Sequence, residues 1–169
     1  MRIWITLFVL CAITPLAAQE TTHSPVNLTI VKNVSSNADL IKAVNQKIWN
    51  YAEVGLKESR SSKLLQTHLQ DAGFKVKTGL SKMPTAFVAE YGSGNPIIGI
   101  LAEYDALPGL SQKIANHQTP LKEGANGHGC GHSGLGAGAL GAALAIKEVL
   151  DQHALKGAIR LYGTPAEET

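Results

Sequence analysis

Cysteine, histidine and glutamate side chains gather in two short segments of this 169-residue chain. The segment from Gly127 to His132 reads GHGCGH, which places one thiol and two imidazoles between glycines. The last seven residues, from Gly163 to Thr169, contain two adjacent glutamates. Thiolate, imidazole and carboxylate groups bind Zn and related divalent ions, and a free carboxylate beside such an ion can accept a proton from its water. The two segments together indicate a metal-dependent hydrolase.

Each group is ambiguous by itself. Cys130 and His132 supply two ligands, fewer than a metal site requires, and a Cys-x-His pair is also compatible with a glycine-rich turn around a buried cysteine. His128 is either a third ligand or a residue that orients one. One of Glu167 and Glu168 could bind metal while the other accepts a proton, or the pair could form an exposed acidic loop end.

Asp105 adds a further carboxylate close to the end of an apolar run. Residues 96–102 are almost continuously apolar, which is typical of a buried central strand. Asp105 could bind metal or orient a ligand, and the alternative is a turn aspartate that caps nearby backbone groups. Because ligands bind beyond the carboxyl ends of strands in open α/β sheets, we expect Asp105 and the glutamate pair at one sheet edge.

The elements that must position these residues follow from hydrophobic periodicity. Helices are expected over about 38–52, 59–72 and 133–153, the first with Asn37 as its N-cap. Strands are expected over 74–78, 85–91, 96–102 and 157–163, with a hairpin-length turn at 92–95. Residues 103–131 form a long loop without periodicity. This order indicates an α/β sandwich with a mixed sheet.

Composition limits the class of protein. The formal net charge is +2 and no long charged run occurs, which argues against nucleic acid or an anionic membrane surface as a partner. Residues 1–18 carry the pattern of a cleaved signal peptide, with an uncleaved anchor as the alternative; cleavage predicts an exported protein, periplasmic or extracellular, without stable membrane insertion. Residues 19–37 are polar and are expected to form a partly disordered arm.

Removal of residues 1–18 would leave Cys130 as the single cysteine, so no internal disulfide could form. A lone thiol in an oxidising compartment is either buried and inert or held by a metal. The neighbouring histidines favour the metal. A redox thiol protein is a further interpretation, and it predicts that Cys130 reacts readily even when metal is present.

Three ordered motifs resemble the M20 family of metallopeptidases and amidohydrolases, especially the branch of the p-aminobenzoyl-glutamate hydrolase B subunit. They lie at residues 98–110, 126–132 and 163–168, and the resemblance covers about residues 38–169. One departure is Ser133, where the family usually has Asp or Asn; we expect this serine to cap the following helix.

The resemblance implies a zinc-peptidase type of mixed-sheet α/β sandwich with two divalent metal ions, Zn or Mn. Cys130, His132 and Glu168 match metal ligands, and Glu167 matches the general base. It also implies an incomplete catalytic domain over 38–169, because the family's lid domain, through which a homo-oligomer could form, and its later histidine ligands come after the Glu-Glu motif.

These features predict a parent enzyme that hydrolyses an amide bond of an N-acyl or N-aroyl amino acid or a small dipeptide. The 169-residue chain itself is expected to be an inactive N-terminal fragment. The alternative is a truncated, non-catalytic protein that binds a metal or another ligand.

Overall fold

The computed structural model describes residues 24–169 of the chain. The predicted signal peptide, residues 1–18, lies outside the described residues. The helices are α1 (Pro25–Ser36), α2 (Ala38–Tyr51), α3 (Ser59–Asp71) and α4 (His132–Gln152), with a short 3₁₀ helix, η1, at Leu80–Lys82. The strands are β1 (Lys75–Thr78), β2 (Phe87–Ser93), β3 (Ile97–Ala102) and β4 (Gly157–Gly163). The predicted α/β class with a mixed sheet is confirmed.

The four strands form one sheet in the order β1-β2-β4-β3. Strand β4 pairs in parallel with β3 and antiparallel with β2, and β2 pairs antiparallel with β1. Two predictions were therefore wrong. Residues 92–95 do not close a hairpin, because β4 lies between β2 and β3. Among the described residues, β3 is an edge strand, and its apolar residues Ile98 and Leu101 are 52% and 63% exposed.

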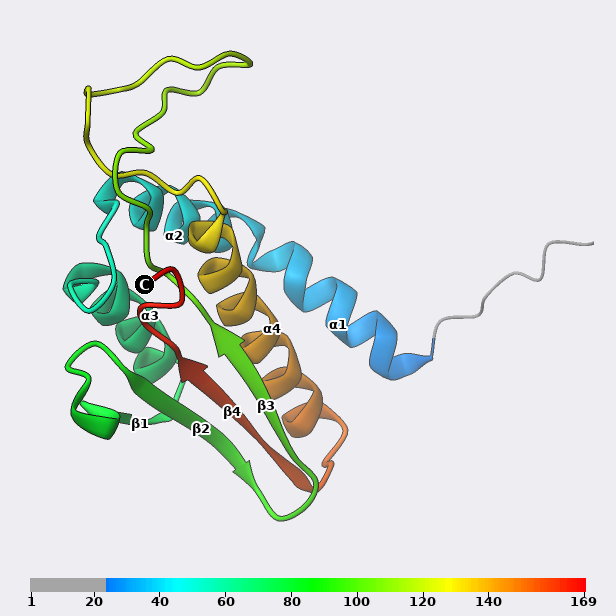
Figure 1. Ribbon diagram of the computed structural model, residues 1–169. Helices are drawn as coiled ribbons and strands as arrows, with labels where there is room; N and C mark the ends of the chain where they lie inside the picture. The colour runs from blue at the N-terminus through cyan, green and yellow to red at the C-terminus, as the bar shows by residue number, and fades with distance from the viewer. Residues whose placement is uncertain (1–23) are drawn as a thin grey trace, which may run out of the picture.

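The core lies between the sheet and helices α3 and α4, which pack against one face of the strands (Figure 1), and α2 packs against these two helices and completes the core. The small residues of α4 let this helix approach its neighbours closely. A Cβ atom at Gly136 would lie 2.8 Å from the carbonyl oxygen of Glu103, and one at Gly141 would lie 2.6 Å from Ile41. Helix α4 is long and apolar enough to cross a membrane, but half of its most apolar window is buried in the protein, as in a core helix.

The N-terminal arm, expected to be partly disordered over residues 19–37, is helical over most of its described part, because residues 25–36 form helix α1. Pro25 occupies the first turn, where its missing N–H costs nothing, and the Ser24 side chain accepts a hydrogen bond from the backbone N–H of Asn27. Helix α1 packs along α4, and the Thr29 hydroxyl lies 3.0 Å from Nε2 of His153. Capping and packing therefore outweigh the polar composition here.

Of the two predicted caps, Asn37 is confirmed in position but makes no capping hydrogen bond with its side chain, and the prediction for Ser133 was wrong. Asn37 occupies the N-cap position of α2, but its amide donates backward to the carbonyl of Asn33. Ser133 lies inside α4, because the helix already begins at His132 and Gly131 is the N-cap residue. Gly131 has φ +106°, a conformation that side chains rarely adopt. The glycine, and not the serine, thus provides the sharp entry into α4.

Truncation of the core should show which apolar residues hold this layer together. Leu140 on α4 is fully buried, whereas Leu135 on the same helix is 52% exposed. We expect Leu140→Ala to lower the free energy of unfolding by about 2–5 kcal/mol, because it removes buried surface and leaves a cavity. Leu135→Ala is the matched control and should change it by less than about 0.5 kcal/mol. Urea denaturation measures both, and equal losses would contradict the packing described here.

Candidate metal centre

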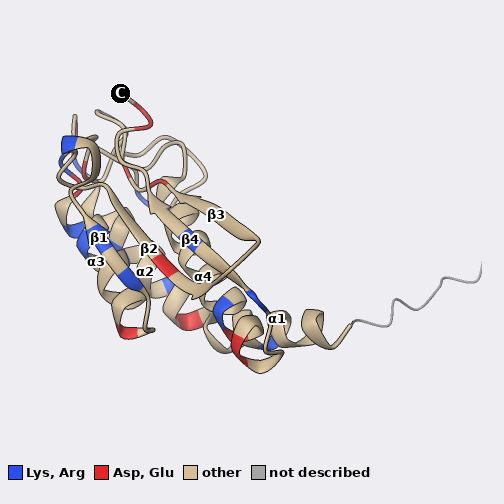
Figure 2. Ribbon diagram, turned by 90° about the horizontal axis from the view of Figure 1, so that it is seen from below, with Lys and Arg blue, Asp and Glu red and all other residues tan. Residues whose placement is uncertain are grey.

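The parallel pairing of β3 and β4 brings the acidic segments together. Ala102 at the end of β3 is paired with Gly163 at the end of β4, so the residues that follow both strands leave the sheet at the same edge. Figure 2 shows acidic positions at the C-terminal end of the chain, where the loops gather. The backbone N–H of Glu168 donates a 2.9 Å hydrogen bond to Oδ2 of Asp105. The predicted meeting of these segments at one sheet edge is confirmed.

His132 lies at the centre of this edge, 2% exposed, as the first residue of α4. Its Nδ1 atom is 2.8 Å from Oδ1 of Asp105. A carboxylate accepts hydrogen bonds, so Nδ1 carries the hydrogen and donates it. The lone pair of a neutral imidazole is then on Nε2, which is the arrangement of a metal-binding histidine held by a carboxylate.

Three carboxylates surround Nε2 of His132. The distances from this atom are 3.1 Å to Oε2 of Glu103, 3.8 Å to Oε2 of Glu167 and 3.8 Å to Oε1 of Glu168. The ligand atoms of Cys130, His132 and Glu168 lie within 4.8 Å of one another, and so do those of Glu103, His132 and Glu167. These five side chains are called the donor cluster below.

The donor set fits a divalent metal ion. Oε1 of Glu168 is buried and has no hydrogen-bond partner, which is costly for a carboxylate oxygen unless a cation completes its surroundings. Four carboxylates, those of Glu103, Asp105, Glu167 and Glu168, are close to one imidazole, and such crowding of like charge favours a bound cation. Imidazole, thiolate and carboxylate together suit Zn and related ions.

The thiol of Cys130 is exposed, so the interpretation as an inert buried cysteine is wrong. A hydrogen bond and the negative charge of Glu168 raise the pKa of Cys130, and the charges of Glu167 and Glu103 raise it further. These neighbours favour the protonated thiol in the metal-free protein. A divalent ion would reverse that balance, because a coordinating thiol is deprotonated.

His128 is not a member of the donor cluster. Its Nε2 atom lies 3.0 Å from the carbonyl oxygen of Ile48, and its Nδ1 atom is buried without a partner. Burial lowers the pKa of His128, which favours the neutral ring. Its contact with the end of α2 supports a role in holding the loop, and it is not in either group of three ligands.

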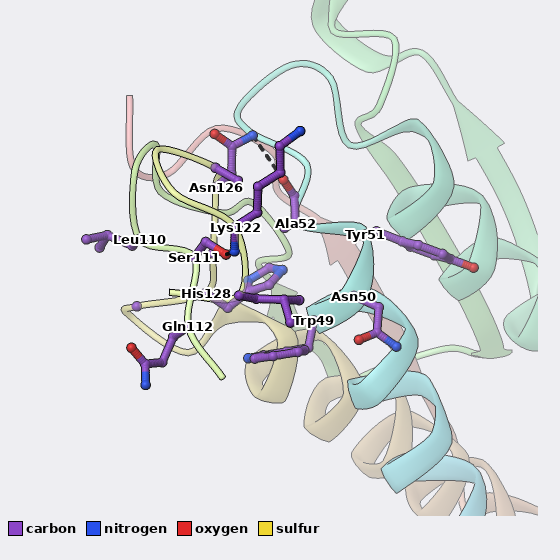
Figure 3. A pocket seen from close by; sticks show the side chains of 14 residues that line it. Trp49, Asn50, Tyr51, Ala52, Leu110, Ser111, Gln112, Lys122, Asn126 and His128 are labelled. Carbon is purple, nitrogen blue, oxygen red and sulfur yellow. Dashed lines mark hydrogen bonds between the residues drawn. The ribbon is translucent and has the colours of Figure 1, made fainter. Parts of the chain in front are cut away.

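A cavity of about 520 Å³ adjoins the segment before Cys130 (Figure 3). One wall comes from the end of α2, including Trp49, and the other from the long loop, including Lys122 and His128. The Asn126 amide donates a 3.2 Å hydrogen bond to the carbonyl of Ala52 and ties the walls together. No member of the donor cluster lines this cavity. Residues 127–129 line it and lead directly to Cys130, so the cavity and the donor cluster lie next to each other.

Glu103 is a member of the cluster that the sequence did not single out as a site residue. Glu103 lies two residues before Asp105, directly after strand β3. Side chains two residues apart in extended backbone point to the same face, and this spacing could have grouped the two carboxylates from the sequence. Asp105 is 1% exposed and contacts His132 directly, whereas Glu103 reaches the opposite ring nitrogen. The two carboxylates therefore lie at opposite nitrogens of the His132 ring.

Comparisons with known proteins agree with this geometry. Residues 99–169 match the model of peptidase family M20/M25/M40. The chain is 44% identical over 126 residues to the B subunit of p-aminobenzoyl-glutamate hydrolase from Escherichia coli, covering 74% of this chain and 26% of that protein. It is 32% identical over 137 residues to N-acetyl-L-cysteine deacetylase of Bacillus subtilis, covering 80% and 32%.

A solved structure from Bacillus subtilis, described as a dinuclear metal-binding peptidase of family M20, shares the fold. Its TM-score is 0.66 at 24% identity, over 79% of this chain and 36% of that one. The chain spans between a quarter and a third of the length of the two curated relatives. The motifs, the mixed sheet and these matches lead to one conclusion: the chain belongs to peptidase family M20.

Proposed function

We propose that the whole protein hydrolyses the amide bond of an N-acyl or N-aroyl amino acid with the help of two divalent metal ions. The observation that carries this proposal is the convergence of Cys130, His132 and Glu168 at the sheet edge, with Glu167 beside them. The names of the relatives support the substrate class, because p-aminobenzoyl-glutamate and N-acetyl-cysteine both contain an acyl group joined to an amino-acid nitrogen.

In this proposal Cys130, His132 and Glu168 hold metal, and Asp105 keeps the His132 ring in the tautomer that leaves Nε2 available. Glu103 is a further carboxylate that could hold the second ion, since it lies 3.1 Å from the same nitrogen. When bound, such ions polarise a carbonyl group and lower the pKa of a water molecule.

Glu167 is the proposed general base. Its side chain is 55% exposed, in contrast to 18% for Glu168, so it faces the space where a substrate would arrive. It can accept a proton from the attacking water and then deliver it to the amide nitrogen as the C–N bond breaks. The adjacent glutamates thus take different roles because one is enclosed and the other is open.

The test is hydrolysis of p-aminobenzoyl-glutamate by the whole protein, followed as released p-aminobenzoate by chromatography. We expect turnover with added Mn²⁺ or Zn²⁺ and its loss after treatment with a chelator. A panel of N-acetyl and N-benzoyl amino acids would define the acyl group. Tight metal binding without hydrolysis of any of these amides would overturn the proposal and support the non-catalytic alternative.

Export of the protein is a separate proposal, based on the sequence of residues 1–18. The N-terminal sequence of the protein recovered from its native host would test it. We expect a mature N-terminus close to Gln19.

A further inference from the structure

A buried glutamate that the proposed chemistry does not use lies behind the donor cluster. Glu58 precedes α3 at its N-cap position and is 0% exposed. Among residues 24–169, no lysine, arginine or histidine forms an ion pair with it. Burying a carboxyl group without a cation is unfavourable, so its presence in place of a simple apolar side chain needs a physical reason.

Both oxygens of Glu58 accept hydrogen bonds from groups outside α3. The backbone N–H of Ala166 donates to Oε1 at 2.9 Å, and the hydroxyl of Thr85 donates to Oε2 at 2.9 Å. Ala166 immediately precedes Glu167 and Glu168. The side chain thus spans from the start of α3 to the loop that carries the glutamate pair, over 108 residues of sequence.

The loop residue that Glu58 holds is conformationally unfavourable. Ala166 has φ +62°, in the left-handed region that alanine rarely adopts. Such residues persist where the surroundings over-determine them. Close packing adds to the hydrogen bond here, because a Cβ atom at Gly55 would lie 3.0 Å from the Cβ of Ala166. After this turn, a carboxylate oxygen of Glu167 and one of Glu168 each lie 3.8 Å from Nε2 of His132.

The second oxygen of the Glu58 carboxylate belongs to a buried hydrogen-bond network around Thr85. The carbonyl oxygen of Thr85 accepts hydrogen bonds from the hydroxyls of Ser62 and Tyr104, each at 2.7 Å. Tyr104 is directly followed by Asp105, whose Oδ2 accepts the backbone N–H of Glu168. Two buried carboxylates, Glu58 and Asp105, therefore hold the backbone on either side of Glu167.

We propose that Glu58 is a positioning residue that fixes the backbone of Ala166 and thereby sets Glu167 and Glu168 in place for metal binding and proton transfer. The proposal rests on the proposed function for its chemical meaning. The geometric part, that Glu58 fixes the loop, can be tested independently of any metal.

The experiment compares Glu58→Ala, Glu58→Gln and the unchanged protein. Alanine leaves two buried donors without an acceptor. Glutamine can keep both contacts, because its carbonyl accepts from Ala166 while its amide donates to a Thr85 hydroxyl that turns to accept. We expect alanine to speed hydrogen exchange at the Ala166 and Glu168 amides and to lower Co²⁺ affinity about 10–100-fold, with an altered Co²⁺ absorption spectrum. Glutamine should restore both readouts.

Leu69→Ala is the matched control. Leu69 is fully buried on the same helix, and its truncation destabilises the core without removing a hydrogen bond to the loop. We expect it to lower the thermal midpoint while leaving the Co²⁺ spectrum unchanged. If Glu58→Ala does not fold, Glu58→Asp takes its place, since the shorter side chain cannot reach both donors.

The outcomes separate the two proposals. If the unchanged protein binds no Co²⁺, the proposed metal function fails, and amide exchange alone decides the role of Glu58. If the protein binds Co²⁺ but Glu58→Ala retains the original exchange rates, affinity and spectrum, the positioning role is wrong. Equal changes in Glu58→Ala and Leu69→Ala would also overturn it, because the effect would then come from general loss of stability.

Discussion

Replacing Glu167 by glutamine should lower the turnover of an N-acyl amino acid by about 10²–10⁴-fold while the protein keeps its metal. The amide has nearly the same size as the carboxylate but cannot accept a proton from water at neutral pH. The side chain of Glu167 is 55% exposed, so the substitution should not disturb folding. Steady-state kinetics and metal analysis of the purified protein measure the two quantities.

The neighbouring residue is the control for this experiment. Glu168→Gln changes the same group one position later, but Oε1 of Glu168 is buried and without a hydrogen-bond partner. We expect this variant to lose metal as well as turnover. If both variants lost metal equally, the division of roles between the two glutamates would be wrong. Near-normal turnover in Glu167→Gln would exclude it as the base.

The sequence predicted the positions of the elements well, because most of the fold depends on local periodicity. Strand β4 occupies residues 157–163 as expected, and the loop over 103–131 contains no regular helix or strand. The order of the strands was not predictable in the same way. An apolar run looks alike in a central strand and in an edge strand, so the position of β3 depends on pairing between residues far apart in sequence.

The candidate site was partly predictable for a related reason. Cys130, His132 and the glutamate pair could be chosen by residue type, and the family resemblance selected Glu168 from that pair; the structure brings Cys130, His132 and Glu168 together. The contact of Asp105 required the structure, because residue type alone could not place its carboxylate 2.8 Å from Nδ1 of His132. Glu58 carried no signal in the sequence, since a glutamate before a polar helix is usually exposed.

The glycines of the GHGCGH segment illustrate how sequence and structure combine. A Cβ atom at Gly127 would lie only 2.0 Å from the carbonyl oxygen of Leu110, so the close approach of the two backbones requires glycine there. This packing fixes residues 107–111 against the segment that leads to Cys130. The glycines therefore set the path of the loop, while the residues between them determine the chemistry.

Replacing Cys130 by alanine should lower the metal affinity more than the loss of a residue that only orients a ligand. The latter loss lowers metal affinity by about 10–100-fold. The thiol is exposed and contacts Glu168, so its removal deletes a ligand without opening the core. Titration with Co²⁺ measures the affinity, and the sulfur-to-metal absorption band should disappear. Cys130→Ser is the matched control for shape, because it keeps a polar group of similar size that is a poorer ligand for soft ions.

Chemical reactivity provides the deciding comparison for Cys130, because it separates a metal ligand from a redox thiol. A bound metal ion occupies the sulfur, so alkylation of the Cys130 peptide, followed by mass spectrometry, should slow when Zn²⁺ is added. A redox thiol would react at the same rate with and without metal. Protection by Zn²⁺ in the unchanged protein that is lost in His132→Ala would show that thiol and imidazole bind one ion. Protection that survives in His132→Ala would mean that the two residues do not share a site.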